Sequence, residues 1–286
     1  MSERTHALLT IIFAGLCACD AICIMAVGLG PVDPADRGNP ARILWQETSR
    51  MRVAAPPFRA GETLRYRVAW KGVPCAEFRT TLRTERRGGR DWLVMGYEGR
   101  TGSVIELLWS FSTAGETWLD PGTLLPSHGV RVSREKDEVE VSWTRFDRLS
   151  RSVSEIKMES DDEEPDFERI AFVHGLDLPA MFLMVRALEW DTPGSRTLEL
   201  VHGDEAYALE LVPDGKQVVE TKAGRFEALA VDLKVSALTG DEDEQQAETQ
   251  RYRRIRLWLS EKRRIPVRVE MEVFVGAVTL ELTGME

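Results

Sequence analysis

Arg251–Gly284, RYRRIRLWLSEKRRIPVRVEMEVFVGAVTLELTG, carries the clearest structural pattern of the chain. Apolar residues alternate with polar or charged ones in three runs, IRLWL, IPVRVEMEVFV and VTLEL. Alternation with a period of two is typical of strands that bury one face and expose the other. Ser260–Arg264 and the step Val275–Gly276 separate the runs and have the composition of turns. The stretch therefore predicts a three-stranded antiparallel meander that closes a sheet.

Shorter alternating runs fill most of the chain from Phe58 onward, and one helix interrupts them. Asp177 stands at a cap position and Pro179 falls in the first turn, so we predict a helix over 178–190. This helix is apolar nearly all round, which favours burial against a concave sheet. We expect a mainly β fold for 58–286, as one β-rich domain. Its architecture is a curved antiparallel sheet or incompletely closed β-barrel with one packed helix near 178–190.

Two smaller features of the chain also carry local predictions. Ser103–Trp109 places apolar residues at the spacing of a helical turn packed on the sheet. Asp214–Gly215 is a hairpin signal, which predicts that separate strands precede and follow it.

The first 30 residues are apolar almost throughout after Arg4 and His6, and we interpret them as an export signal or membrane anchor. Leu16–Cys19 has the form of a lipobox, in which Cys19 would be acylated. Ala26–Gly28 offers an ordinary cleavage site instead, and an uncleaved anchor is the third alternative. Residues 31–57 are rich in proline and form a tether between this segment and the β domain.

The composition excludes several classes of site. The net charge of −10 argues against nucleic acid as a partner, since a basic face supplies most of that affinity. Of four cysteines only Cys75 lies outside the N-terminal apolar segment, so a cysteine-based zinc site is excluded by count. Cys75 itself has the setting of a small buried residue. We expect no metal and no cofactor.

No catalytic motif stands out along the chain. The G-x-S-x-G, H-E-x-x-H, G-x-G-x-x-G and Walker patterns are all missing from the sequence. His174 and His202 are far apart in the chain. A hydrolase would need one of these histidines to converge with a carboxylate in a cleft.

Several segments, in this order, resemble an exported bacterial family catalogued as domain of unknown function 3108. They are Phe58–Tyr66 (FRAGETLRY), Asp177–Arg186, Ala223–Phe226, Leu257–Ser260, Arg264–Val267, and Gly276 followed by Leu280–Thr283. The resemblance covers about residues 58–284. It implies an envelope protein with a β-rich, barrel-like domain, and it implies no activity.

We therefore expect a non-enzymatic envelope protein that binds or carries an apolar or lipid-like ligand, and that meets the membrane through its N-terminal segment. The first alternative is a structural or assembly protein that binds another envelope component. The second alternative is a hydrolase. In a half-open barrel, aromatic residues and methionines line a ligand cavity or simply fill the core. Arg186 is the predicted headgroup partner, with an ion pair to a nearby acid as its alternative. The residues of the predicted ligand site are Trp70, Met181, Phe182, Met184, Arg186 and Trp258.

Overall fold

The computed structural model of the chain describes residues 57–102, 110–160, 164–172, 174–191, 193–203, 205–238, 252–273 and 276–286. The predicted export segment 1–30, with Cys19, lies outside the described residues. So do the predicted helical turn Ser103–Trp109 and the tether 31–57, apart from its last residue. Within the described ranges, no helix is both long enough and apolar enough to cross a membrane.

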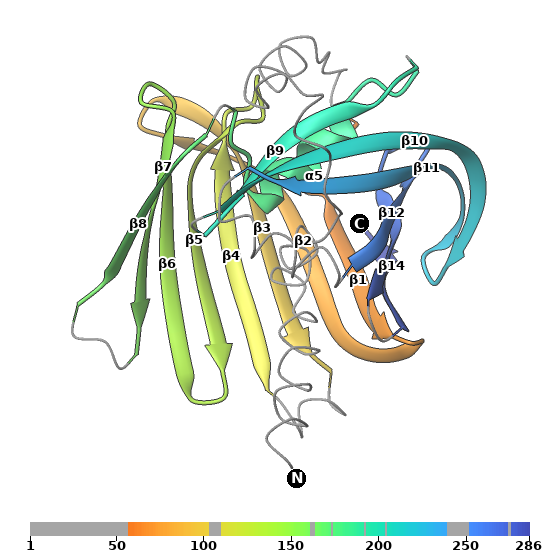
Figure 1. The fold of residues 1–286 in the computed structure, drawn as a ribbon, viewed down its shortest axis with the longest axis horizontal. Helices are drawn as coiled ribbons and strands as arrows, with labels where there is room; N and C mark the ends of the chain where they lie inside the picture. Colours follow the sequence, from red (N-terminus) through yellow and green to blue (C-terminus); the bar gives the residue numbers. More distant parts are fainter. Residues whose placement is uncertain are drawn as a thin grey trace, which may run out of the picture.

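One sheet of fourteen strands accounts for most of the described chain, and the strands that neighbour one another in it run antiparallel (Figure 1). The sheet order is β8-β7-β6-β5-β4-β3-β2-β1-β14-β13-β12-β11-β10-β9, so β8 and β9 are its two edges and the sheet is not closed into a barrel. The sheet is strongly curved, and helix α5 lies inside the curve. These features confirm the predicted fold class.

The bounds of the elements follow the alternating runs of the sequence. They are β1 (Thr63–Trp70), β2 (Val73–Arg87), β3 (Arg90–Thr101), β4 (Phe111–Leu119), β5 (Pro126–Glu135), β6 (Glu138–Asp147), β7 (Ser152–Glu159), β8 (Asp166–Ala171), α5 (Leu178–Ala187), β9 (Arg196–His202), β10 (Glu205–Thr221), β11 (Gly224–Ala237), β12 (Tyr252–Ser260), β13 (Pro266–Val273) and β14 (Gly276–Met285).

The predicted meander is confirmed as β12, β13 and β14. Leu257 faces Val269 across the first pair, and Val269 faces Leu280 across the second, so one apolar row crosses all three strands. The last strand then pairs with the first, with Tyr66 opposite Leu282. The end of the chain therefore joins its two halves into one sheet.

Helix α5 begins and ends where local chemistry satisfies its free backbone groups. The Asp177 carboxylate accepts a hydrogen bond from the Ala180 N–H at 2.9 Å, and Pro179 occupies the first turn, where it needs no donor. The backbone becomes extended at Leu188, so the helix ends at Ala187 and not at Trp190 as predicted. The helix contacts β3, β4 and β9 and buries Leu183 against the sheet.

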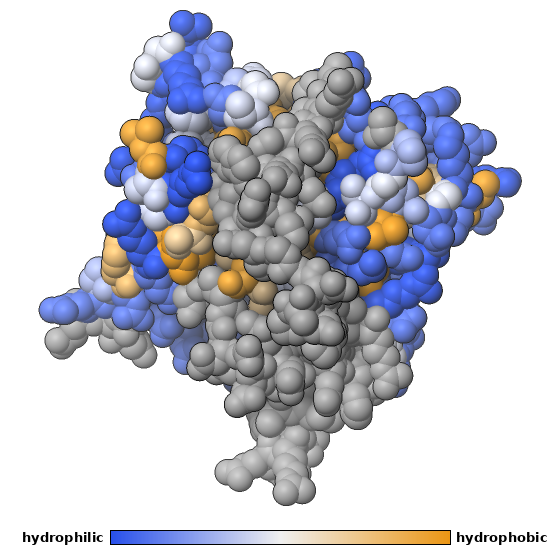
Figure 2. All heavy atoms as spheres, turned by 45° about the horizontal axis from the view of Figure 1, so that its top comes forward, coloured by the Kyte–Doolittle hydropathy of each residue, from blue (hydrophilic) through white to orange (hydrophobic). Residues whose placement is uncertain are grey.

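The core occupies the concave face of the sheet, where inward side chains of both halves meet α5. Leu119 on β4 and Leu282 on β14, which β3, β2 and β1 separate in the sheet, are both 0 % exposed. On the face shown in Figure 2, hydrophilic residues cover the flanks and hydrophobic ones gather toward the middle. Burial of apolar area is the main favourable term for such a fold.

The hairpin predicted at Asp214–Gly215 is wrong. Strand β10 continues through this dipeptide to Thr221, and its pairing with β11 shifts register between Pro213 and Lys216. Gly215 has a φ of 79°, a conformation that glycine adopts at little cost and that suits a bulge. The dipeptide therefore bends one long strand, and the hairpin turn to β11 follows Thr221.

Candidate functional site

An apolar crevice lies between α5 and the strands of the second half of the sheet. Its volume is about 80 Å³. Met181, Phe182 and Val185 form the helix side, and these side chains face apolar residues from six strands. The strand residues are Leu200, Leu209, Leu233, Val235, Ile255, Leu257, Pro266, Val269 and Leu280.

Half-buried side chains form the opening of the crevice to the outside. Met181 and Phe182 are partly exposed on the helix, and so are Leu233 and Val269 on the strands. The ring of Phe182 also meets Tyr66 edge to face, with ring centroids 6.4 Å apart. This contact fixes one wall of the crevice, while Met181 keeps the adaptability of an unbranched thioether.

Only two of the six predicted ligand residues line this crevice. Met181 and Phe182 do. Met184 is 6 % exposed and packs in the core, as its alternative interpretation held. Trp70 lies at the end of β1, packed against the core with the Lys71 ammonium 5.5 Å from its ring centroid.

Trp258 lies on the other face of the sheet. Successive residues of a strand point to opposite faces, so Trp258 points away from Leu257, which lines the crevice. Its indole N–H donates to Gln217 at 3.0 Å, and the Arg256 guanidinium lies 6.0 Å from its ring centroid. The structure therefore does not bring Trp258 together with Met181 and Phe182.

Arg186 is held in a buried ion pair, which was the alternative to its predicted headgroup role. Its guanidinium donates to both carboxylate oxygens of Glu62, at 2.6 and 3.0 Å, and the two side chains are 1 % and 2 % exposed. Arg263 adds a third hydrogen bond to Glu62 at 2.9 Å. The Phe58 ring covers the guanidinium at 5.1 Å. Glu62 and Arg186 belong to two of the segments that carry the family resemblance, yet sequence alone does not pair them.

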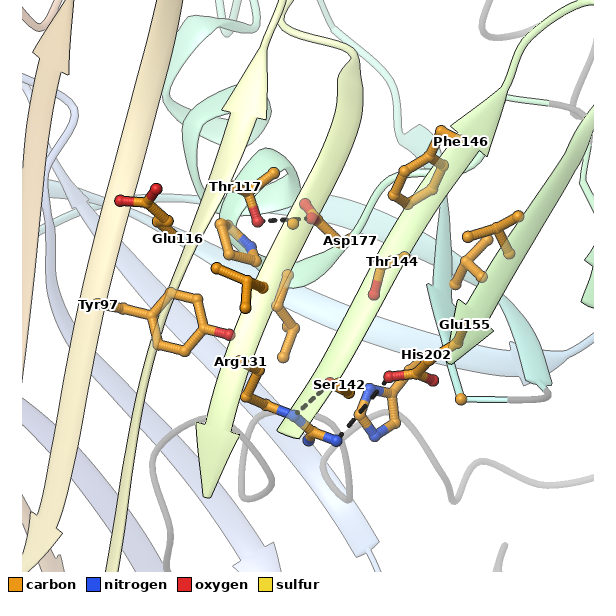
Figure 3. A pocket seen from close by; sticks show the side chains of 17 residues that line it. Tyr97, Glu116, Thr117, Arg131, Ser142, Thr144, Phe146, Glu155, Asp177 and His202 are labelled. Atoms are coloured by element: carbon orange, nitrogen blue, oxygen red, sulfur yellow. Dashed lines mark hydrogen bonds and ion pairs between the residues drawn. The ribbon is translucent and has the colours of Figure 1, made fainter. Parts of the chain in front are cut away.

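A second, polar cleft lies at the start of α5, toward β4–β7 (Figure 3). The Thr117 hydroxyl donates to the Asp177 carboxylate at 2.7 Å. Burial raises the pKa of Asp177 to about 6, although these hydrogen bonds and the nearby Arg148 favour its ionised form. Asp177 is thus the cap of α5 and a carboxyl with a perturbed pKa at the same time.

Ion pairs occupy the floor of this cleft. Arg131 donates to Ser142 at 3.3 Å and to Glu140 at 2.8 Å, and it lies 4.0 Å from Glu155. Lys157 approaches the same Glu155 at 3.9 Å. The hydrogen-bond partner of Ser142 is therefore a guanidinium. Because a guanidinium does not deprotonate in proteins, Arg131 cannot act as a general base for the Ser142 hydroxyl.

The structure places the two histidines differently. His202 lines the polar cleft, whereas His174 is not among its lining residues. The His174 backbone N–H donates to Glu199 at 2.5 Å, and desolvation lowers the pKa of its imidazole. Cys75 is 3 % exposed, as predicted, and burial raises the pKa of its thiol to about 11. Within the described ranges, no three metal-ligating side chains converge on a common point.

Comparison with known proteins gives the family. The chain belongs to the family described as "Protein of unknown function (DUF3108)", whose model matches residues 65–283. This confirms the resemblance found in the sequence. No curated protein matches the chain.

Three solved structures resemble the chain. A β-barrel-like protein of domain of unknown function DUF1849 from Brucella abortus has a TM-score of 0.49 at 11% identity, covering 79% of this chain and 97% of its own. A candidate exported protein with a YmcC-like fold from Bacteroides fragilis has a TM-score of 0.33 at 9% identity, covering 82% and 100%. A candidate lipoprotein from Parabacteroides distasonis has the same four values. The identities are too low to indicate a shared ligand or activity.

Proposed function

We propose that this chain is an exported, non-enzymatic protein of the cell envelope that binds an apolar or amphipathic ligand, such as a lipid. The ligand enters the crevice between α5 and the curved sheet. The observation that carries the proposal is the composition of this crevice, because all twelve lining residues are apolar. Contact between this apolar surface and water is unfavourable in free energy. A bound apolar group removes that contact and therefore stabilises the complex.

The size of the crevice limits what it holds. Its volume of about 80 Å³ is far below the roughly 300–1,000 Å³ of ordinary small-molecule pockets. It therefore accepts the end of an acyl chain and not a whole lipid. The remainder of the ligand lies along the half-buried lip formed by Met181, Phe182 and Val269. Movement of Met181 widens the entrance, since its side chain has many accessible rotamers.

The envelope location rests on the N-terminal sequence. Residues 1–30 export the chain or anchor it, and the tether 31–57 spaces the β domain, residues 58–286, from the membrane. Acylation of Cys19, cleavage after Gly28 and retention of the whole segment give three different intact masses. Intact-mass analysis of the protein purified from its own envelope distinguishes them, and a cytoplasmic protein that starts at Met1 contradicts all three.

The polar cleft supplies the one observation that favours a hydrolase. His202 lines it together with Ser142 and Glu155. However, Glu155 faces Arg131 and Lys157, and Ser142 receives a hydrogen bond from Arg131. These contacts form an ion-pair network that holds β5, β6 and β7 together, so we prefer the carrier function. An assembly protein would instead use the free edge of β8 to add a strand from a partner.

The test is native mass spectrometry of the full chain purified from its own envelope, followed by extraction of lipid. We expect a co-purifying apolar ligand. Val269→Phe places a ring in the crevice and should release it, whereas Val218→Phe, at a valine that is 52% exposed on β10, should leave binding unchanged. The proposal fails if no ligand co-purifies, or if both variants retain it equally.

A further inference from the structure

The outer face of β5–β8 carries a row of apolar side chains across four strands. Val130 pairs with Trp143, Trp143 with Ile156, and Ile156 with Phe167. Directly opposed residues in antiparallel strands point to the same face, so the four side chains form one continuous row. This row ends at Phe167, on the edge strand β8.

A second apolar row runs beside the first. Val132 pairs with Val141, and Val141 pairs with Met158. Each lies two residues from a member of the first row, and therefore on the same face. Four side chains of the two rows are exposed, and we call them the outer apolar patch. They are Trp143 (45% exposed), Ile156 (39%), Met158 (42%) and Phe167 (64%).

In β6 and β7, some polar residues are buried on the concave face while their apolar neighbours are exposed on the outer face. A buried concave face normally has the opposite pattern, with apolar residues inside. On β7 the polar Glu155 is buried while Ile156, next to it, is exposed. On β6 Ser142 is 2 % exposed while Trp143 is 45 % exposed. The patch lies on the face opposite to the polar cleft, because Ser142 and Glu155 line that cleft. Exposed apolar residues gathered in this way mark an interaction surface more often than isolated ones do.

Charges of both signs lie beside the patch. The exposed Glu159 and Asp166 adjoin Met158 and Phe167 in the chain, while arginines occupy the flanking rows on the face of the patch itself. Arg145 and Arg169 lie in the neighbouring row on the same face, and Arg134 follows Val132 on the other side. The nearest acid of the same row on β4 is Glu116, whose carboxylate accepts from Arg83 at 2.8 Å and from Trp118 at 3.0 Å. A partner that covers the patch therefore meets arginines in the two flanking rows.

We infer that the outer apolar patch docks onto the surface of a lipid bilayer that contains anionic headgroups. Apolar and tryptophan side chains enter the boundary between headgroups and acyl chains, and flanking arginines bind phosphates. The inference does not depend on the crevice, which lies on the opposite face of the sheet.

The test uses the full-length chain reconstituted in vesicles of phosphatidylethanolamine and phosphatidylglycerol with brominated acyl chains, which quench nearby tryptophans. Trp143→Phe keeps an apolar ring in the patch but removes the reporter, so the difference between wild type and this variant isolates Trp143. We expect Trp143 to be quenched. Ile156→Ser with Phe167→Ser should lower the docked-to-free ratio about a hundredfold, or about tenfold for each side chain.

Val218→Ser is the matched control, since Val218 is an exposed apolar residue outside the patch. It should leave the quenching of Trp143 unchanged, and unfolding curves should show that all variants are folded. Vesicles of phosphatidylcholine alone should quench Trp143 less. The inference is overturned if Trp143 is not quenched in anionic vesicles, if the double serine variant is quenched like the wild type, or if the patch is instead buried in a dimer.

Discussion

Replacing Glu62 by glutamine tests whether the buried ion pair holds α5 on the sheet. Glu62 lies just before β1, and Arg186 lies in the last turn of α5, so their bidentate contact joins two distant parts of the chain. Glutamine keeps the shape and one acceptor oxygen, but it leaves a guanidinium that is 1 % exposed without its counter-charge. Breaking a buried pair in this way costs about 3–5 kcal/mol.

The structure also predicts that losing Glu62 and losing Arg186 lower the free energy of unfolding by different amounts. Arg186→Met leaves Glu62 with the Arg263 guanidinium at 2.9 Å, whose side chain is 39 % exposed and adjusts easily. Methionine in its place packs against Phe58 and Phe182, which now cover the guanidinium at 5.1 and 5.7 Å. We therefore expect Arg186→Met to destabilise less than Glu62→Gln. Glu62→Leu combined with Arg186→Met should cost less than Glu62→Gln alone, since no charge is then left buried.

The measurement is urea unfolding followed by tryptophan fluorescence, with the slope m checked for each variant. Because domains of this kind are stable by about 5–15 kcal/mol, a loss of about 3 kcal/mol leaves a folded baseline. The reasoning is refuted if Glu62→Gln changes the free energy of unfolding by less than about 1 kcal/mol, the level of an exposed pair. A double variant, Glu62→Leu with Arg186→Met, that costs as much as Glu62→Gln alone would equally contradict it.

Two further predictions concern other parts of the sheet. Burial raises the pKa of Asp177 from 3.8 to about 6, so the folded state binds the proton more tightly than the unfolded state does, and stability should fall as the pH rises from about 4 to about 6. Asp177→Asn keeps a capping side chain and should lack this slope in unfolding curves measured across that range, whereas equal slopes would exclude the assignment. Gly115→Ala should cost about 1–3 kcal/mol, because its Cβ would lie 2.5 Å from both the Tyr97 hydroxyl and the Val130 carbonyl oxygen. Gly122→Ala is its control, since the nearest atom there is at 3.4 Å, and similar melting temperatures for both variants would contradict the clash.

Much of the fold was predictable because period-two alternation and a capped helix are local signals. The three closing strands, the cap at Asp177 and the apolar helix follow from residues that are neighbours in sequence. Local signals did not predict features that depend on contacts between segments far apart in the sequence. Asp214–Gly215 has the composition of a turn, but continued pairing of β10 with β11 keeps the strand running. The pairing of Glu62 with Arg186 spans most of the domain, and no local pattern indicates it.

The candidate sites were harder to predict, because alternation divides a strand into two faces without stating which one is covered. For Leu257 and Trp258 the sequence places the residues on opposite faces, and the structure shows that only the face of Leu257 meets α5. For Trp143 the sequence also leaves open which face is covered, and here the apolar residue lies on the exposed face. Its face would be the core if apolar residues always turned inward, but Arg131, Glu140 and Glu155 form their ion pairs on the other side. Glu155 is 9 % exposed on that inner side while Trp143 is 45 % exposed on the outer side, and the ion pairs offset part of the cost of burying the charges. A sheet with the helix on one part of its concave face and charges on the remainder thus acquires an apolar surface on its outside, and it is there that we expect a membrane to bind.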